Sequence, residues 1–118
     1  MEQNDRRERS VYIAGPMTGY VMHNFPAFEA ARCELRLRGF HAMYSGQDVK
    51  DFTHPWEYYM RIALSMLVKC NCIALLPGWE HSRGATMEHN IAMMLNMEVI
   101  ELNFCYQGAK ENAQSSGT

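Results

Sequence analysis

Short apolar segments alternate with longer segments of helical periodicity along most of the chain. The apolar segments are residues 11–14, 40–44, 72–76 and 99–102, and the helical segments are residues 26–38, about 55–67 and about 84–96. This alternation is typical of strands and crossover helices. It predicts an α/β fold with three layers, of the flavodoxin or Rossmann type. We expect a parallel sheet of about four strands with helices on both faces.

Individual residues support these boundaries. Pro26 suits the first turn of a helix, and Gly39 suits the position after its end. Cys33 falls within the apolar pattern of this helix, so we expect a buried free thiol there. In the third helix, the residues expected to face the core are Met87, Ile91, Met94 and Leu95.

The connections between the strands predict where a ligand binds. Right-handed crossovers join parallel strands, and we expect the strand order 2-1-3-4. This order reverses between the first and third strands, and ligands of open α/β sheets bind at such a switch point, beyond the carboxyl ends of the strands. The two loops at this point follow Ala14 and Leu76.

The first loop reads Gly15-Pro16-Met17-Thr18-Gly19-Tyr20. Its two glycines permit a tight turn and a close approach of a ligand to the backbone. Thr18 adds a hydroxyl group. The alternative interpretation is an ordinary turn between a strand and a helix, since the loop lacks the spacing of the known phosphate-binding fingerprints.

The second loop carries more polar chemistry. Ser82 and the backbone N–H groups from Arg83 to Ala85 lie at the start of a helix, where an anion or a sugar hydroxyl group can bind. Arg83 adds a charged donor, although an exposed arginine is an equally good interpretation. Trp79 either stacks on a base or packs against the loop.

Glu88 and Tyr12 are the predicted catalytic pair. Glu88 lies about one turn into the third helix, so its carboxylate can face the switch point. It either interacts with the helix dipole and solvent, or stabilises an electron-poor sugar carbon, as glycosyl transfer requires. Tyr12 lies in the first strand, where its hydroxyl group can bond to the carboxylate or be satisfied within the core.

Two segments, V-Y-I-A-G-P-M-T-G and L-L-P-G-W-E-H-S-R-G-A-T-M-E-H-N-I-A, carry a family resemblance. The chain resembles the nucleoside 2-deoxyribosyltransferase superfamily over about residues 11–102, and most of all its short branch in bacteriophages and prophages. Its relatives include 2′-deoxynucleoside 5′-phosphate N-hydrolases. The resemblance implies cleavage or transfer at the N-glycosidic bond of a deoxynucleoside or its 5′-monophosphate. Glu88 corresponds to the nucleophile and Tyr12 to the tyrosine that assists it.

The resemblance also implies a set of substrate-binding residues and no cofactor or metal. Gly15 and Gly19 match the glycines of the first loop, and Ser82 and Gly84 match the turn that holds the sugar or phosphate. The residues expected to bind substrate are Gly15, Met17, Thr18, Gly19, Phe25, Trp79, Ser82, Arg83 and Gly84. Phe25 or Trp79 would flank the base, and water or a second base would complete the reaction.

One departure from the family pattern weakens the enzymatic interpretation. Relatives carry an aspartate on the helix before the third strand, and Ala63 stands in its place. Loss of such an acid costs about 10²–10⁴-fold in rate unless another group substitutes. Asp48, Asp51 and Glu57 are candidates. The alternatives to an enzyme are a non-catalytic protein that binds a nucleotide or nucleotide-derived signal, and an interaction protein that keeps the fold.

Composition limits the remaining classes. The 118 residues suit one domain at 10–106 between disordered tails at 1–9 and 107–118. The formal net charge of −2 gives no electrostatic reason for binding long nucleic acid. No apolar run suits a membrane span or a signal peptide, so we expect a cytoplasmic protein without a membrane partner. The cysteines and histidines lack the spacing of metal ligands.

The resemblance finally implies a homodimer or higher homo-oligomer in which a neighbouring subunit completes the pocket. Asn103, Phe104 and Tyr106 follow the last strand, where such a contribution would arise. Ten methionines are many for this length. They indicate either adaptable packing in the core or a flexible helix–helix interface.

Overall fold

A computed structural model describes residues 9–49 and 51–103. Its strands are β1 (Ser10–Ala14), β2 (His41–Met43), β3 (Cys72–Leu75) and β4 (Glu98–Glu101). Its helices are α2 (Phe25–Leu37), α3 (Trp56–Leu67) and α4 (Arg83–Met94). Short 3-10 turns occupy Val21–Asn24, Ser45–Asp48 and Trp79–His81. The predicted alternation of strands and helices is confirmed, and the three short turns were not predicted.

The four strands form one parallel sheet in the order β2-β1-β3-β4, as predicted. Tyr12 in β1 pairs with Met43 in β2 on one side and with Ile73 in β3 on the other. β1 and β3 are therefore the central strands, and their carboxyl ends lie side by side. Leu76 N–H donates to Ala14 C=O at 2.9 Å, which extends this pairing to the loops that follow.

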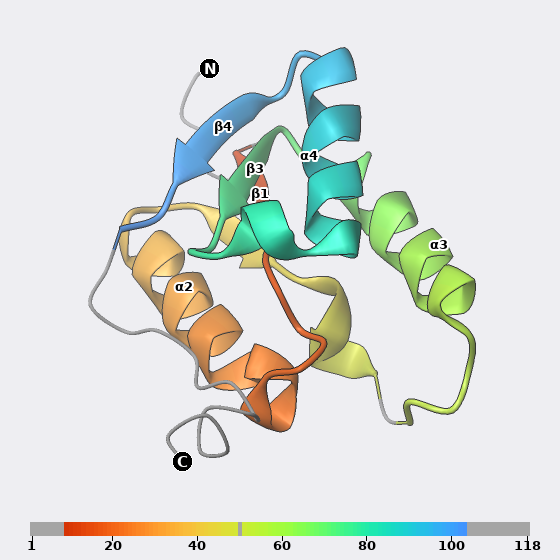
Figure 1. Ribbon diagram of the computed structural model, residues 1–118. Helices are drawn as coiled ribbons and strands as arrows, with labels where there is room; N and C mark the ends of the chain where they lie inside the picture. The colour runs from red at the N-terminus through yellow and green to blue at the C-terminus, as the bar shows by residue number, and fades with distance from the viewer. Residues whose placement is uncertain (1–8, 50, 104–118) are drawn as a thin grey trace.

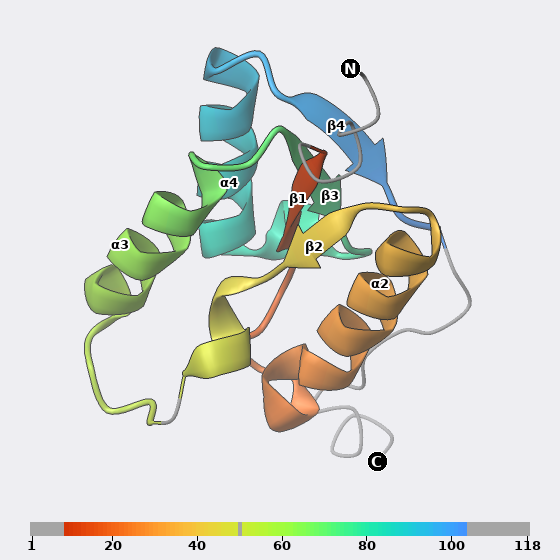
Figure 2. The same cartoon turned by 180° about the vertical axis from the view of Figure 1, so that it is seen from behind.

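Helices cover both faces of the sheet (Figures 1 and 2). α2 packs on one face, where Phe28 and Leu35 meet Val11 and Ile13 of β1. α3 and α4 pack on the other face, against Tyr12, Ala14, Ile73 and Leu75. Successive side chains of a strand point to opposite faces. The buried strands β1 and β3 therefore need apolar residues at nearly every position, which is why their sequences show no alternation.

The predicted core face of α4 is wrong except at Ile91, which is partly buried against the core. Met87, Met94 and Leu95 are exposed, and the residues of α4 that face the sheet are Ala85, Glu88 and Ala92. Both sets have helical spacing, so periodicity alone did not separate them. The small alanines let the helix approach the sheet closely, whereas the longer methionines lie on the outer side.

Two further predictions concern Cys33 and the ends of the chain. Cys33 is exposed, contrary to the expected buried thiol, while Cys70 and Cys72 are buried. The predicted tails fall outside the described residues, apart from Arg9, and so do Phe104 and Tyr106. None of the described helices has the length and apolar character to cross a membrane. Among the same residues, no cluster of three or more histidine, cysteine or acidic side chains could hold a metal ion.

Candidate active site

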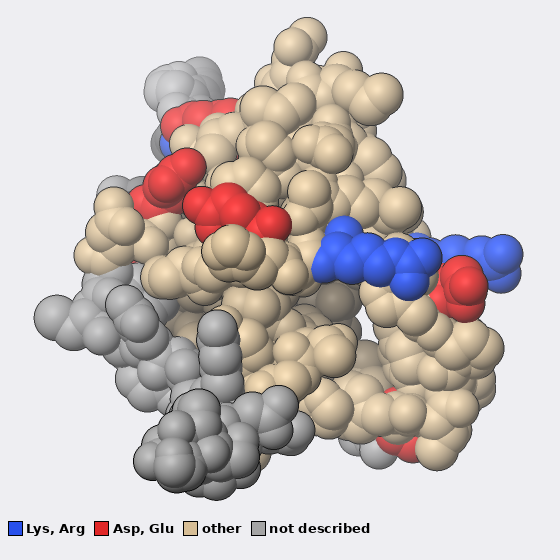
Figure 3. Space-filling view, viewed as in Figure 1, with Lys and Arg blue, Asp and Glu red and all other residues tan. Residues whose placement is uncertain are grey.

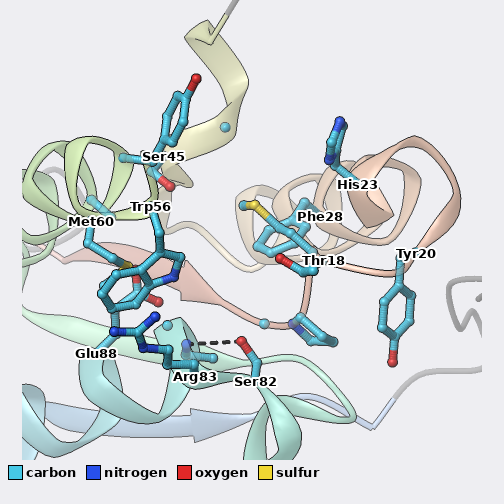
Figure 4. Close-up of a pocket in the computed structure, with 18 of the residues that line it drawn as sticks. Thr18, Tyr20, His23, Phe28, Ser45, Trp56, Met60, Ser82, Arg83 and Glu88 are labelled. Atoms are coloured by element: carbon cyan, nitrogen blue, oxygen red, sulfur yellow. Dashed lines mark hydrogen bonds between the residues drawn. The ribbon is translucent and has the colours of Figure 1, made fainter. Parts of the chain in front are cut away.

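A pocket of about 860 Å³ opens at the carboxyl edge of the sheet. Its walls come from the loop after β1, the turn after β2, the start of α3, and the loop and first turns of α4. Figure 4 shows side chains from these segments converging on it, and in Figure 3 the surface is hollowed beside blue Lys or Arg side chains. This is the switch point between β1 and β3 that the predicted strand order indicated.

Glu88 and Tyr12 meet in this pocket. The Tyr12 hydroxyl group donates a hydrogen bond to Glu88 Oε2 at 2.6 Å. Both residues line the pocket, yet they are only 1% (Tyr12) and 5% (Glu88) exposed. Tyr12 comes from the central strand, and Glu88 comes from the second turn of α4 on the side that faces the sheet. The two residues named as a pair from sequence are therefore in direct contact.

Burial sets the protonation behaviour of this pair. It raises the pKa of Glu88 to about 7, and the hydrogen bond from Tyr12 opposes that rise. The pKa of Tyr12 is raised well above its usual value, mainly by burial and then by the charge of Glu88. Tyr12 therefore stays a hydrogen-bond donor at neutral pH, while Glu88 exists in both its protonated and its ionised form.

The first loop lines the pocket through Gly15, Met17, Thr18 and Gly19. A Cβ atom on Gly15 would lie 2.7 Å from Leu76 Cβ, so only glycine lets the two loops approach this closely. The buried Asn24 donates from Nδ2 to Pro16 C=O at 2.9 Å and ties the loop to the start of α2. The loop is thus held against the second loop.

The second loop contributes Ser82, Arg83 and Gly84 to the pocket wall. Ser82 Oγ accepts a hydrogen bond from Ala85 N–H at 3.1 Å and caps α4. The Arg83 guanidinium group stacks on the Trp56 ring, 3.6 Å from its centroid. No described residue forms a hydrogen bond or an ion pair with Arg83, so its N–H groups are free to meet a ligand.

Two predicted base-stacking residues are not on the pocket wall. Trp79 packs against His89, with ring centroids 4.5 Å apart. Phe25 does not line the pocket but packs directly against Gly46. A Cβ atom added to Gly46 would lie 2.5 Å from the Phe25 ring. Trp79 belongs to a 3-10 turn that directs its ring toward α4, and sequence spacing did not reveal this turn.

Other aromatic rings take their place. His23, Phe52, Trp56 and Tyr59 line the pocket. The rings of His23 and Phe52 stack with centroids 4.1 Å apart, which joins the loop after β1 to the segment after β2. The start of α3 was recognisable from Pro55, but nothing in the sequence placed it opposite α4 across the ligand site.

The described part of the pocket contains one acidic residue, Glu88. Ala63, which the resemblance implies stands where relatives carry an aspartate, is buried and lines the wall. Of the suggested substitutes, Asp51 lies 3.5 Å from His54 Nδ1 and Glu57 is exposed, and neither lines the pocket. The side chain of Asp48 lies outside what the structure describes. The arrangement therefore supplies one buried carboxyl group without a second acid to partner it.

Comparison with known proteins gives a family and a fold. The family model described as "Domain of unknown function (DUF4406)" matches residues 9–101. The chain belongs to this family. The search of curated proteins gave no match. The matched residues of this DUF4406 chain include both loops of the pocket and all of α4.

A solved structure described as "2-desoxiribosyltransferase from Leishmania mexicana" has a similar fold. The TM-score is 0.62 at 14% sequence identity, over 80% of this DUF4406 chain and 63% of the other chain. The likeness covers the α/β fold, and the DUF4406 chain spans less than two thirds of that protein's length.

Proposed function

We propose that this protein cleaves, or transfers at, the N-glycosidic bond of a deoxynucleoside or deoxynucleoside 5′-monophosphate. The observation that supports this most strongly is the Glu88–Tyr12 pair, buried at the wall of a pocket large enough for a nucleoside. Such reactions pass through an oxocarbenium-like transition state, which a carboxylate stabilises. The similarity in fold to a deoxyribosyltransferase supports the same class of reaction.

In the proposed mechanism, Glu88 is the nucleophile. Its Oε2 accepts the hydrogen bond from Tyr12, and no described residue bonds to Oε1. Oε1 attacks the anomeric carbon, the bond from that carbon to the base nitrogen breaks, and the base leaves with the bonding electrons and gains a proton. Water or a second base then attacks the same carbon, loses a proton, and releases the Glu88 carboxylate.

Arg83 favours the 5′-monophosphate among the proposed substrates. It is the one arginine or lysine among the described residues that line the pocket. It lies five positions before Glu88, a rise of about 7.5 Å along a helix. A deoxynucleotide can span that distance between its anomeric carbon and its phosphate. The stacked guanidinium group keeps its N–H donors available for phosphate oxygens.

The second candidate function is nucleotide binding without turnover. The observation that favours it is Ala63, which leaves the described pocket wall without a second acid to protonate the leaving base. Such a protein would hold a nucleotide or nucleotide-derived signal in the same pocket.

Release of free base separates the two candidates. The protein is incubated with each deoxynucleoside and each deoxynucleoside 5′-monophosphate, and the products are followed by chromatography. Base release that is lost in Glu88→Gln and kept in Glu80→Gln supports the enzyme, because Glu80 is exposed and does not line the pocket. A rise in melting temperature without product supports the binding protein.

A further inference from the structure

The Glu88–Tyr12 pair does not supply a proton to the leaving base. Tyr12 donates its one hydroxyl proton to Glu88, and Glu88 carries the single carboxyl group among the described residues of the pocket wall. The proton must therefore come from a group of another kind. Histidine is the side chain that most often performs such transfers. Two histidines, His23 and His81, line the pocket.

His23 lies on the aromatic side of the pocket. Its ring stacks on that of Phe52, with centroids 4.1 Å apart and an interplanar angle of 19°, and the Phe25 ring lies 5.6 Å away at a tilt. Nucleic-acid bases stack on such rings, so this side suits the base. Figure 4 shows His23 on a different side of the pocket from Arg83, the proposed phosphate contact. His81, by contrast, ends the turn that leads into Arg83.

A strained stretch of backbone presents His23 to the pocket. Met22, His23 and Asn24 have φ values of 54°, 54° and 64°. Residues other than glycine adopt this left-handed conformation at a cost in free energy, and they keep it only where the surroundings enforce it. Asn24 provides such a constraint, because it is buried and donates to Pro16 C=O at 2.9 Å. Strain of this kind is concentrated at functional sites.

The His23 ring is available to a ligand and to solvent. Its contacts among the described residues are with aromatic rings, and none of these residues forms a hydrogen bond with its nitrogens. The neighbouring Tyr59 differs, since its hydroxyl group donates to Asp51 C=O and accepts from the His54 N–H, both at 3.0 Å. His23 is exposed, so water can exchange protons with it between turnovers. Imidazole groups gain and lose a proton close to neutral pH.

We propose that His23 is the general acid that protonates the leaving base, an inference that rests on the proposed function. As the bond from the anomeric carbon to the base nitrogen breaks, its electron pair goes to the base. The imidazolium form of His23 transfers its N–H proton to a ring nitrogen of that base and becomes neutral. Water or a second base then attacks the ester on Glu88 and gives its proton to His23, which restores the imidazolium.

A substrate that needs no proton isolates this role. In nicotinamide 2′-deoxyriboside 5′-monophosphate the base is already a cation, and it leaves as neutral nicotinamide. This compound is compared with the natural deoxynucleoside 5′-monophosphate that gives the fastest base release. We expect His23→Phe to lower kcat for the natural substrate about 10²–10⁴-fold, the usual contribution of a general acid. The rate with the nicotinamide compound should stay nearly unchanged.

Two variants separate the proton from the ring that carries it. His23→Phe keeps an aromatic ring against Phe52 and removes the proton. His23→Asn removes the ring and keeps a residue type that tolerates a positive φ, so one variant remains if the other does not fold. Both should show the same selective loss. The control is His41→Gln, which should change neither rate, because His41 is exposed at the start of β2 and does not line the pocket.

The two substrates also separate this inference from the proposed function. Cleavage of the nicotinamide compound that is lost in Glu88→Gln supports the proposed function whatever His23 does. Wild-type release of a natural base by His23→Phe would then overturn the role of His23 alone, as would the selective loss appearing in His81→Gln instead. Wild-type protein that cleaves only the nicotinamide compound would also overturn it. Release of base from neither substrate would reject both.

Discussion

The most unusual residue of this protein is Glu88, because its carboxyl group is buried away from water. Glu88 is buried beside Tyr12, and no described arginine, lysine or histidine forms an ion pair with it. Ionising such a group in a buried site is costly, which is why its pKa rises to about 7. A residue kept for stability alone would favour a neutral side chain here. The position therefore fits a functional role.

The first prediction concerns stability and pH. The folded state binds the Glu88 proton more tightly than the unfolded state, so the stability contributed by this group falls between pH 4.5 and about 7. The penalty at higher pH is on the order of 3 kcal/mol. Glu88→Gln removes it. In urea unfolding, the free energy of unfolding of Glu88→Gln should increase relative to that of the wild type as pH rises through this window. A difference in unfolding free energy that does not change with pH would contradict the raised pKa.

The second prediction concerns Tyr12. Tyr12→Phe keeps the ring in the core and removes the hydrogen bond to Glu88. A hydrogen bond to a charged group contributes about 1.5–3 kcal/mol, so base release should fall roughly ten- to a hundredfold. The pKa of Glu88 should rise further, because the bond from Tyr12 lowers it. The rate measured across pH tests both effects, and wild-type activity in Tyr12→Phe would exclude a role for the hydroxyl group.

Glu88 and Tyr12 could be placed at the switch point from sequence because strong local signals flank them. Gly15 and Pro16 mark the end of the first strand, and Ser82 marks the start of α4. Ser45 had no such signal. It follows the weakest strand, three residues long, and its place on the pocket wall depends on the register between β1 and β2.

At the scale of elements, the close approach of two loops shapes the pocket. The third prediction is that Gly15→Ala lowers stability by about 1–3 kcal/mol, because its Cβ would lie 2.7 Å from Leu76 Cβ. Gly19→Ala is the control, since a Cβ there meets open space and costs only the strain of a φ of +85°. Urea unfolding midpoints compare the two. Equal midpoints for Gly15→Ala and the wild type would show that the loops can separate without cost.

The positions of the strands and helices were predictable from the sequence. The sides that the helices turn toward the core were only partly predictable. The strands and helices lie within two residues of the expected boundaries, since Pro, Gly and apolar runs mark them. The core-facing side of α4 was mostly predicted wrongly, because methionines and alanines follow the same helical spacing on different sides. The aromatic side of the pocket depends on tertiary contacts such as the His23–Phe52 stack.

At the scale of the whole molecule, the outer face of α4 is rich in methionine and also exposes Arg83 and Asn90. Its exposed positions include Met87, Met93 and Met94, and Figure 3 shows tan atoms across this part of the molecule. Exposed apolar patches often mark protein–protein contacts. This face is where we expect the predicted homo-oligomer to form.

The fourth prediction tests that surface. Met94 is 79% exposed on α4, and Leu37 is 86% exposed at the end of α2, across the sheet. Met94→Glu should convert an oligomer into monomers, whereas Leu37→Glu should leave it intact. Light scattering during gel filtration measures the mass of each. A monomeric wild type, or equal masses for both variants, would reject the α4 interface.

The most direct test of the central claim is a search for the covalent intermediate on Glu88. The protein is mixed with the deoxynucleoside 5′-monophosphate that gives the fastest base release, quenched in acid and digested, and the peptides are examined by mass spectrometry. We predict a deoxyribosyl ester on the peptide that contains Glu88, absent from Glu88→Gln, with at least one free base formed for each ester. Base release that continues in Glu88→Gln, with no modified peptide, would contradict Glu88 as the nucleophile.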